Sequence, residues 1–152
     1  MYSITPCICP EILQPLADEA EQGTNSEDFA FEVKAENIMA EMRRLILSPG
    51  SMVLLLFKDG EVIGCMGLEI FTNPFSGKRM ANERCWFVLK KHRGIASLRL
   101  FKAAEQIARK EGCSHFVMNA SNLASSLHDK TVELYKKLGM KHFETSYIKS
   151  LE

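Results

Sequence analysis

The clearest hydrophobic pattern in the chain is an apolar run followed by a turn and a long amphipathic segment. Residues 85–89 are aromatic, aliphatic or Cys, which is typical of a strand buried on both faces. Residues 90–93 are basic or polar, and Gly94 follows them. From Ile95 to Gly112, apolar residues recur at steps of three and four. The pattern predicts a strand, a glycine turn and a helix.

The pattern before this stretch predicts antiparallel strands. Residues 52–57 are apolar, residues 62–71 are mostly apolar, and the two runs are joined through an Asp-Gly pair, which favours a tight hairpin. A looser turn at residues 73–77 leads into the strand that ends at Leu89. Residues 2–9 alternate and are bounded by proline, so they predict an edge strand.

Apolar residues at helical spacing predict further helices over residues 11–21 and 35–47, and one that ends at Leu138. Ser125 or Ser126 is the candidate N-cap of this last helix.

Two more strands are predicted, over residues 114–119 and 141–149. A strand, a helix and a strand joined by a connection of this length form a crossover, so the strand ending at Leu89 should run parallel to residues 114–119. The final strand should return to the sheet.

Composition indicates one domain over residues 1–152, with 46% hydrophobic and 25% charged residues. The longest apolar run, residues 52–57, is too short to cross a bilayer, and the first residues do not resemble a secretory signal. We therefore expect a cytoplasmic protein with no membrane partner. The five cysteines match no common zinc spacing, so neither a metal site nor a disulfide framework is expected.

The charges are unevenly distributed although the net charge is zero. Residues 1–41 hold nine acidic residues and one basic residue, and residues 42–152 hold the other ten acidic and eighteen basic residues. The basic part contains the glycine turn, where it would attract a polyphosphate. The acidic part either lies near a cationic acceptor such as an amine or only solvates two surface helices.

The strand, turn and helix together can form an anion site. The first N–H groups of a helix lack partners within the helix, and its dipole favours negative charge there. Gly94 and Ala96 would keep the wall of such a site low, and Lys90, Lys91 and Arg93 would attract phosphate. Alternatively, the glycine and the basic residues serve turn geometry and solubility alone.

Two segments of the chain contain short motifs that belong together. Residues 91–96 are Lys-His-Arg-Gly-Ile-Ala, and residues 134–140 are Leu-Tyr-Lys-Lys-Leu-Gly-Met. In this order they resemble the two hallmarks of the GNAT N-acetyltransferases, the acyl-CoA signature Q/R-x-x-G-x-G/A and the later L-Y-x-x-x-G-F segment. Lys91 stands where the family prefers Gln or Arg, and the turn is shorter than its commoner form. The resemblance covers residues 52–149 well, and residues 144–149 are also similar to the ending of small phage-borne members.

The resemblance implies an α+β GNAT fold: a mixed, mostly antiparallel sheet of about six strands, with helices on both faces and a splayed central parallel pair. It implies transfer of acetyl from acetyl-CoA to a primary amine, without a metal. Tyr135 matches the family's acid, which protonates the departing thiolate. Glu83 is the candidate base, and strict alternation would place it on the face of Cys85.

The resemblance also assigns residues to the cofactor. Backbone amides of Val88 and Leu89 should contact pantetheine, and Asn119 should hydrogen-bond the pantetheine amides. His128 stands where the family often has an Asn, so a second such contact is not expected. The pyrophosphate should meet the backbone amides of the turn, which are those of Arg93, Gly94, Ile95, Ala96 and Ser97.

Other functions stay open at this stage. A GNAT-like domain that serves as a structural or interaction module, possibly phage-associated, would fit the short turn and Lys91. Nucleic-acid binding would use the basic part of the chain, but no recognition motif accompanies it, so it is not expected. The family often forms dimers, which leaves a homodimer open.

Overall fold

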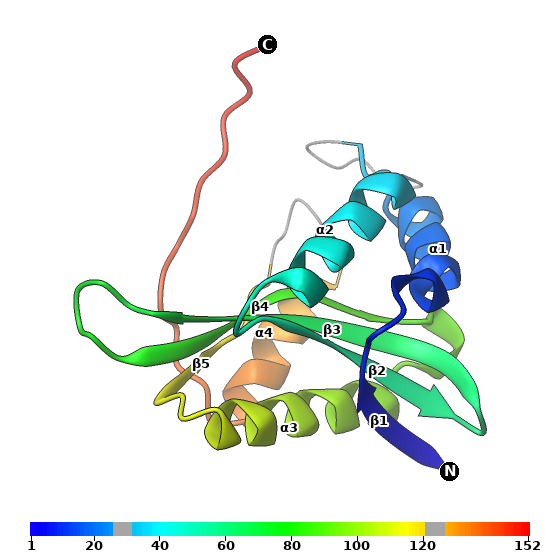
Figure 1. The fold of residues 1–152 in the computed structure, drawn as a ribbon. Helices are drawn as coiled ribbons and strands as arrows, with labels where there is room; N and C mark the ends of the chain where they lie inside the picture. Colours follow the sequence, from blue (N-terminus) through cyan, green and yellow to red (C-terminus); the bar gives the residue numbers. More distant parts are fainter. Residues whose placement is uncertain (26–31, 121–126) are drawn as a thin grey trace. The chain divides into compact units, whose positions relative to one another are not determined.

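The computed structural model describes residues 1–25, 32–120 and 127–152, and it divides into two compact units (Figure 1). The first unit is Met1–Asn119 and the second is Ala120–Glu152. The prediction of a single domain over the whole chain stays a prediction. The predicted caps Ser125 and Ser126 lie outside the described residues.

The first unit is built on a five-stranded sheet in the order β1-β2-β3-β4-β5. The first four strands pair antiparallel and β4 pairs parallel with β5, so the expected mixed sheet is confirmed. The parallel pair lies at the edge of the described sheet and not at its centre. The strands are β1 (Tyr2–Pro6), β2 (Met52–Lys58), β3 (Glu61–Thr72), β4 (Arg79–Val88) and β5 (His115–Val117).

The hairpin between β2 and β3 has the turn that its sequence predicts. Asp59 (φ 51°) and Gly60 (φ 84°) both have positive φ angles, the geometry that an Asp-Gly pair adopts with little strain. Further along β3, Gly64 faces Val88 so closely that a Cβ would lie 2.9 Å from the Phe87 carbonyl oxygen. The sheet therefore needs glycine at this position.

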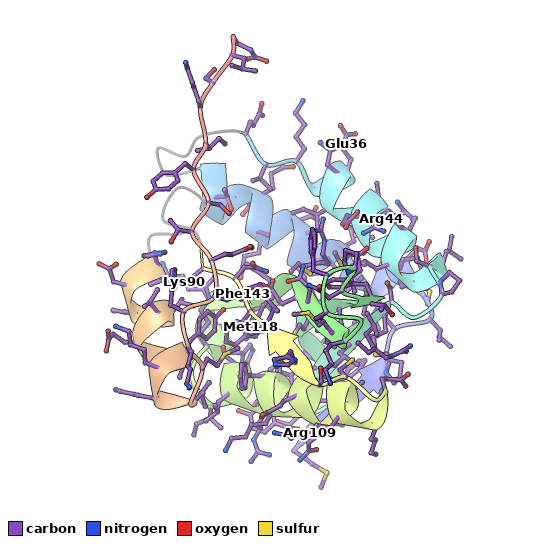
Figure 2. All side chains as sticks on the ribbon, turned by 90° about the vertical axis from the view of Figure 1, so that its left-hand side faces the viewer. Glu36, Arg44, Lys90, Arg109, Met118 and Phe143 are labelled. Carbon is purple, nitrogen blue, oxygen red and sulfur yellow. The ribbon has the colours of Figure 1, made fainter. Side chains whose placement is uncertain are left out.

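Helices cover both faces of this sheet, as expected (Figure 1). One face carries α1 and α2, which bury Leu16, Met39 and Leu45. The other face carries α3, which buries Leu100 and Ala104. Figure 2 shows Glu36 and Arg44 projecting from α2 and Arg109 from α3 on the opposite side. The helices are η1 (Pro10–Leu13), α1 (Gln14–Asn25), α2 (Ala35–Leu47), η2 (Lys90–His92) and α3 (Ile95–Lys110).

A β-bulge changes the alternation along β4. Gly67 pairs with Cys85 but Leu68 pairs with Glu83, so Arg84 is the extra residue. Leu68 belongs to the core under α3, and its partner Glu83 shares that face. The expectation that Glu83 shares a face with Cys85 is therefore wrong, because the bulge shifts the pattern by one residue.

The bulge is tied to α2 by a surface network of four charged residues. Arg84 lies 3.6 Å from Glu41 and 3.7 Å from Glu69, and Arg44 also pairs with both carboxylates. The extra residue of β4 thus contacts both α2 and β3. Each pair is at least partly exposed and contributes little alone, but the four together favour one orientation of the Arg84 side chain.

The second unit contains α4 (His128–Lys137), close to the helix that the sequence predicts. Residues 141–149 form no strand, so this prediction is wrong. Phe143, Tyr147 and Ile148 are exposed. A strand forms only where its backbone finds a partner, and the sequence pattern of one segment does not supply that partner.

Candidate functional site

The site begins where β4 and β5 part. Their parallel ladder holds only three pairs, from Met80 with His115 to Asn82 with Val117. Beyond Asn82 no described strand lies against this edge of β4, which runs on to Val88. The described ladder therefore ends after a short common stretch, and the edge of β4 from Glu83 onwards has no strand partner among the described residues.

Glu83 and Asn119 meet at this point of separation. The backbone N–H and the side-chain Nδ2 of Asn119 both donate to Glu83 Oε2, each at 3.2 Å. Asn119 Nδ2 also donates to the Glu83 carbonyl oxygen at 2.7 Å and to Asn82 Oδ1 at 3.3 Å. The predicted base and a predicted cofactor residue are thus in direct contact.

Glu83 is a buried carboxyl group with a perturbed acidity. Only 7% of the residue is exposed, and burial raises its pKa above the ordinary value of 4.5. The two Asn119 donors and the charge of Arg84 act in the opposite direction, because they stabilise the carboxylate. A carboxylate with a raised pKa is a stronger proton acceptor than an exposed one, which suits a general base.

The turn after β4 leads directly into a helix N-terminus. After η2, Gly94 has φ 106° and ψ −116°, and α3 begins at the next residue. The first bond of the helix runs from the Leu98 N–H to the Gly94 carbonyl (3.2 Å). The amides of Ile95, Ala96 and Ser97 precede it and form the first turn, where N–H groups have no partner within the helix.

The two residues predicted to contact pantetheine, Val88 and Leu89, differ in the direction in which their backbone groups point. The Leu89 N–H donates to the Ile63 carbonyl (2.9 Å), so the sheet uses it. This bond identifies Gly64 and Val88 as a pair that exchanges no backbone hydrogen bonds with each other. The N–H and carbonyl of Val88 therefore point away from β3, towards the open edge of β4. Of the two residues, Val88 presents its backbone to the opening.

Arg93 acts through its side chain, a contact that the sequence pattern did not predict. Its Nε donates to the Val88 carbonyl oxygen (3.0 Å), and its guanidinium carbon lies 5.6 Å from the centre of the Phe87 ring. The Arg93 amide is 3.5 Å from the Lys90 carbonyl, a long hydrogen bond within the short helix. Arg93 therefore lies along the end of β4.

A carboxylate of α1 also reaches the turn. Glu19 Oε2 accepts a hydrogen bond from the Lys90 N–H at 2.9 Å. Nothing in the local sequence could reveal this contact, because the two residues are far apart in the chain. The contact caps the short helix η2 and fixes one end of the turn to α1.

The expectation that small residues at Gly94 and Ala96 give phosphate access to the turn is corrected by the burial and geometry of these residues. Ala96 is only 1% exposed and packs in the core under α3, so its small size serves packing and not access for phosphate. A Cβ at Gly94 would meet no atom within 4 Å in the described part of the chain, so this residue is glycine for its positive φ and not for space. Ile95, the first residue of α3, is 69% exposed, so its side chain lies at the surface beside the first amides of the helix.

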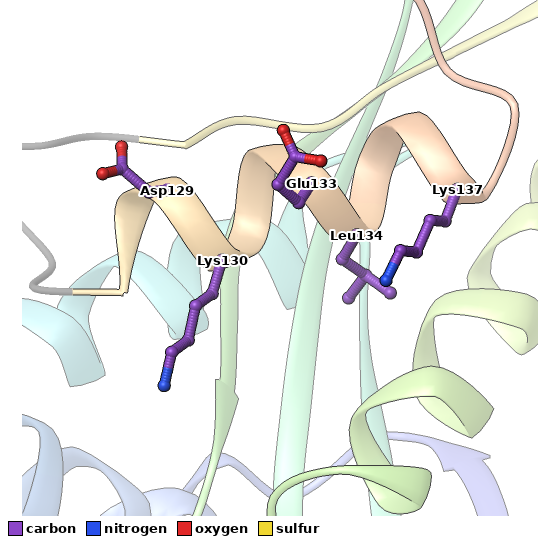
Figure 3. Close-up of a pocket in the computed structure, with 5 residues that line it drawn as sticks. All are labelled: Asp129, Lys130, Glu133, Leu134 and Lys137. Carbon is purple, nitrogen blue, oxygen red and sulfur yellow. The ribbon is translucent and has the colours of Figure 1, made fainter.

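The second unit carries Tyr135 on α4, half-buried and close to the end of the helix. Its carbonyl accepts hydrogen bonds from the Leu138 and Met140 amides, which close the helix around Gly139. A shallow hollow follows one side of α4 (Figure 3). Its lining carries charges of both signs and comes from Asp129, Lys130, Glu133, Leu134 and Lys137.

Metal sites, membrane-spanning helices and disulfides are absent from the described residues. No group of three or more His, Cys, Asp or Glu residues is arranged to hold a metal ion. None of the described helices combines the length and apolar composition that crossing a bilayer requires. The five cysteines are free thiols.

Solved structures with the same fold include proteins of several kinds. An aminoglycoside acetyltransferase, HMB0005, from an uncultured soil metagenomic sample is 15% identical, with a TM-score of 0.74 over 100% of this chain and 99% of its own. Ribosomal-protein-alanine N-acetyltransferase from Brucella melitensis is 17% identical, with a TM-score of 0.74 over 100% of both chains. A transcriptional regulator from Bacillus halodurans is 13% identical, with a TM-score of 0.77 over 99% and 100%. At these identities the likeness shows the fold alone.

Sequence comparison adds the family. A search of curated protein sequences gave no match. The model of the acetyltransferase (GNAT) family matches residues 15–140, which include both hallmark segments, the parting strands and the turn. The chain therefore belongs to the GNAT acetyltransferase family.

Proposed function

We propose that this protein transfers an acetyl group from acetyl-CoA to a primary amine in the cytoplasm. The observation that carries the proposal is the parting of β4 from β5 beside the N-terminus of α3. The parted edge offers backbone groups to the pantetheine arm, and the helix N-terminus offers unpaired N–H groups to the pyrophosphate. Both features lie within one unit, Met1–Asn119.

The reaction is a direct displacement. The amine nitrogen attacks the thioester carbonyl carbon, the new C–N bond forms and the C–S bond breaks. Glu83 takes a proton from the attacking nitrogen, and Tyr135 gives a proton to the departing thiolate. Each of these proton transfers typically contributes about 10²–10⁴-fold.

The cofactor assignments follow the groups that the fold leaves available. Val88 supplies its N–H to pantetheine, since its carbonyl already accepts from Arg93 Nε. The amides of Gly94, Ile95, Ala96 and Ser97 meet the pyrophosphate. Leu89 and the Arg93 amide take a smaller part, since both already have backbone partners. The Arg93 guanidinium is close enough to the turn to contact a phosphate after leaving the Val88 carbonyl.

The acceptor is proposed only as a primary amine. Aminoglycoside and ribosomal-protein alanine acetyltransferases are both among the structural relatives, and they differ in acceptor class. Within the same fold, these choices depend on residues outside the cofactor turn.

The direct test is titration calorimetry with acetyl-CoA and CoA. The variant Ile95→Glu places a negative charge on the exposed front of the helix, and Ile95→Gln is the neutral control of the same size. We expect wild type and Ile95→Gln to bind at micromolar concentration and Ile95→Glu to bind at least about tenfold more weakly, because its charge opposes the pyrophosphate.

Failure of the folded wild type to bind either ligand would contradict the proposal. The alternative, a GNAT-like structural or interaction module that does not catalyse transfer, would then become the leading function. Equal binding by Ile95→Glu and Ile95→Gln would instead show that the N-terminus of α3 is not part of the cofactor site. With binding established, a screen of amines with Tyr135→Phe as the comparison tests the transfer itself.

A further inference from the structure

We infer that Asn119 is a positioning residue that fixes the carboxylate of Glu83 at the point where β4 and β5 part. The sequence resemblance assigned Asn119 to the pantetheine amides instead. The inference rests on the proposed function in one respect only, namely that Glu83 is the base. Its structural part, the hold of Asn119 on the carboxylate, can be tested without any turnover.

The contacts favour this role over cofactor binding. Two donors from Asn119, its backbone N–H and its Nδ2, converge on the same oxygen, Glu83 Oε2. The two hydrogens on Nδ2 are also shared with the Glu83 carbonyl and Asn82 Oδ1. The donors of the Asn119 amide group are thus already directed at Glu83 and its neighbour.

The arrangement distinguishes the two oxygens of the carboxylate. Oε2 receives both bonds from Asn119, whereas no hydrogen bond among the described residues reaches Oε1. A carboxylate held by one oxygen has its other lone pairs in a fixed direction. Oε1 is therefore the oxygen that takes the proton from the attacking amine.

Asn119 also controls the charge of the group that it holds. A buried carboxyl tends to stay protonated, and a protonated base cannot accept a proton. The Asn119 donors stabilise the ionised form and lower the pKa of Glu83 against the effect of burial. Asn119 therefore favours the ionised form of a buried base and leaves one oxygen available.

The alternative is that Asn119 only joins the ends of two strands. Its contacts with the Glu83 carbonyl and with Asn82 Oδ1 would suffice for that role, and the carboxylate would be an accidental neighbour. The two roles differ in what they do to the Glu83 proton, which gives the experiment its readout.

The experiment follows the titration of Glu83 by carbon-13 NMR of glutamate-labelled protein, with Glu83→Gln identifying its signal. Asn119→Ala removes the side-chain donor, Asn119→Asp replaces it with a like charge, and Asn82→Ala removes only the other acceptor. We expect the titration to move to higher pH in Asn119→Ala, to move further in Asn119→Asp, and to stay in place in Asn82→Ala. Thermal melts check that each variant folds.

Turnover supplies the second readout when an acceptor amine is in hand. On the acidic side of the pH profile, kcat/KM should fall about tenfold in Asn119→Ala, as expected for one hydrogen bond to a charged group, and recover at high pH. A Glu83 titration unmoved in both folded Asn119 variants overturns the inference, whatever the activity. A moved titration with an unmoved pH profile overturns Glu83 as the base and leaves the hold of Asn119 established.

Discussion

At the scale of single residues, burying the Glu83 carboxylate lowers the stability of the folded protein. Burial raises its pKa above 4.5, so the folded protein binds this proton more tightly than the unfolded chain does. The contribution of Glu83 to stability is thus most favourable below the unfolded pKa and is lost as the pH rises through the folded pKa. At neutral pH the ionised side chain should destabilise the fold.

Replacing this carboxyl with an amide should therefore stabilise the protein. We expect Glu83→Gln to have a higher urea midpoint than wild type at pH 7. The difference should shrink as the pH falls through the raised pKa of the folded state and should change no further below about pH 4.5, the unfolded pKa. The same variant should lose about 10²–10⁴-fold of the transfer rate. A midpoint at pH 7 below that of wild type would contradict the expected sign.

Two glycines in helical surroundings should respond in opposite ways to alanine. Gly94 has φ 106°, so Gly94→Ala should destabilise the protein by about 1–2 kcal/mol through backbone strain. Gly23 lies inside α1, and a Cβ there meets no atom of the described residues within 4 Å, so Gly23→Ala should stabilise by about 0.5–1 kcal/mol. Chemical denaturation of the two variants, compared with wild type, measures both signs in one experiment.

The sequence was informative for some residues of the site and silent for others. It predicted the glycine turn before α3 and the place of Glu83 on the strand that leads to this turn, because turn geometry and strand position depend on neighbours in the chain. It could not predict that Glu19 would bind the Lys90 amide or that Arg93 would reach Val88. These contacts depend on how distant elements pack, and the local pattern does not encode that packing.

At the scale of elements, the close pairing of β3 with β4 depends on small residues. A Cβ on Gly64 would lie 2.9 Å from a backbone oxygen, which cannot move without the strand, whereas a Cβ on Gly67 would lie 2.7 Å from the end of the Leu45 side chain. We expect Gly64→Ala to destabilise by about 1–3 kcal/mol and Gly67→Ala by less, because Leu45 can rotate. Urea titration of both variants tests this order, and equal losses would contradict it.

Elements with strong periodic patterns were predicted well. The helices Ala35–Leu47 and Ile95–Lys110 match their predicted bounds, since each has a clear apolar stripe and a stop signal. The bulge at Arg84 was missed because one extra residue leaves no mark in the composition of a strand. Residues 141–149 were wrongly predicted as a strand because their pattern does not include a pairing partner.

At the scale of the whole molecule, several carboxylates in the acidic part of the chain, residues 1–41, make structural contacts. Glu19 caps η2, Glu21 accepts a hydrogen bond from the first amide of α2, and Glu41 pairs with Arg44 and Arg84. These contacts account for several of the carboxylates without any substrate. The uneven charge distribution is therefore weaker support for a cationic acceptor than the sequence alone indicated.

Ligand binding should be visible in the stability of the chain. Acetyl-CoA at one hundred times its dissociation constant adds about 2.7 kcal/mol to unfolding, which corresponds to a rise of roughly 5–10 °C in Tm for a protein of this size. Differential scanning fluorimetry should show this rise for wild type and Ile95→Gln. Ile95→Glu should show a smaller rise at the same ligand concentration, and an equal one would contradict the proposed turn.

The short ladder between β4 and β5 has one more consequence, for association between molecules. Edge strands with long exposed backbones invite pairing with other chains, and short or proline-bearing edges do not. In the described sheet, β5 has three residues, and β1 has five and ends at Pro6. The short β5 thus offers little backbone for pairing, but it also leaves the edge of β4 from Glu83 to Val88 without a described strand partner, and this edge is where a neighbouring chain could start to pair.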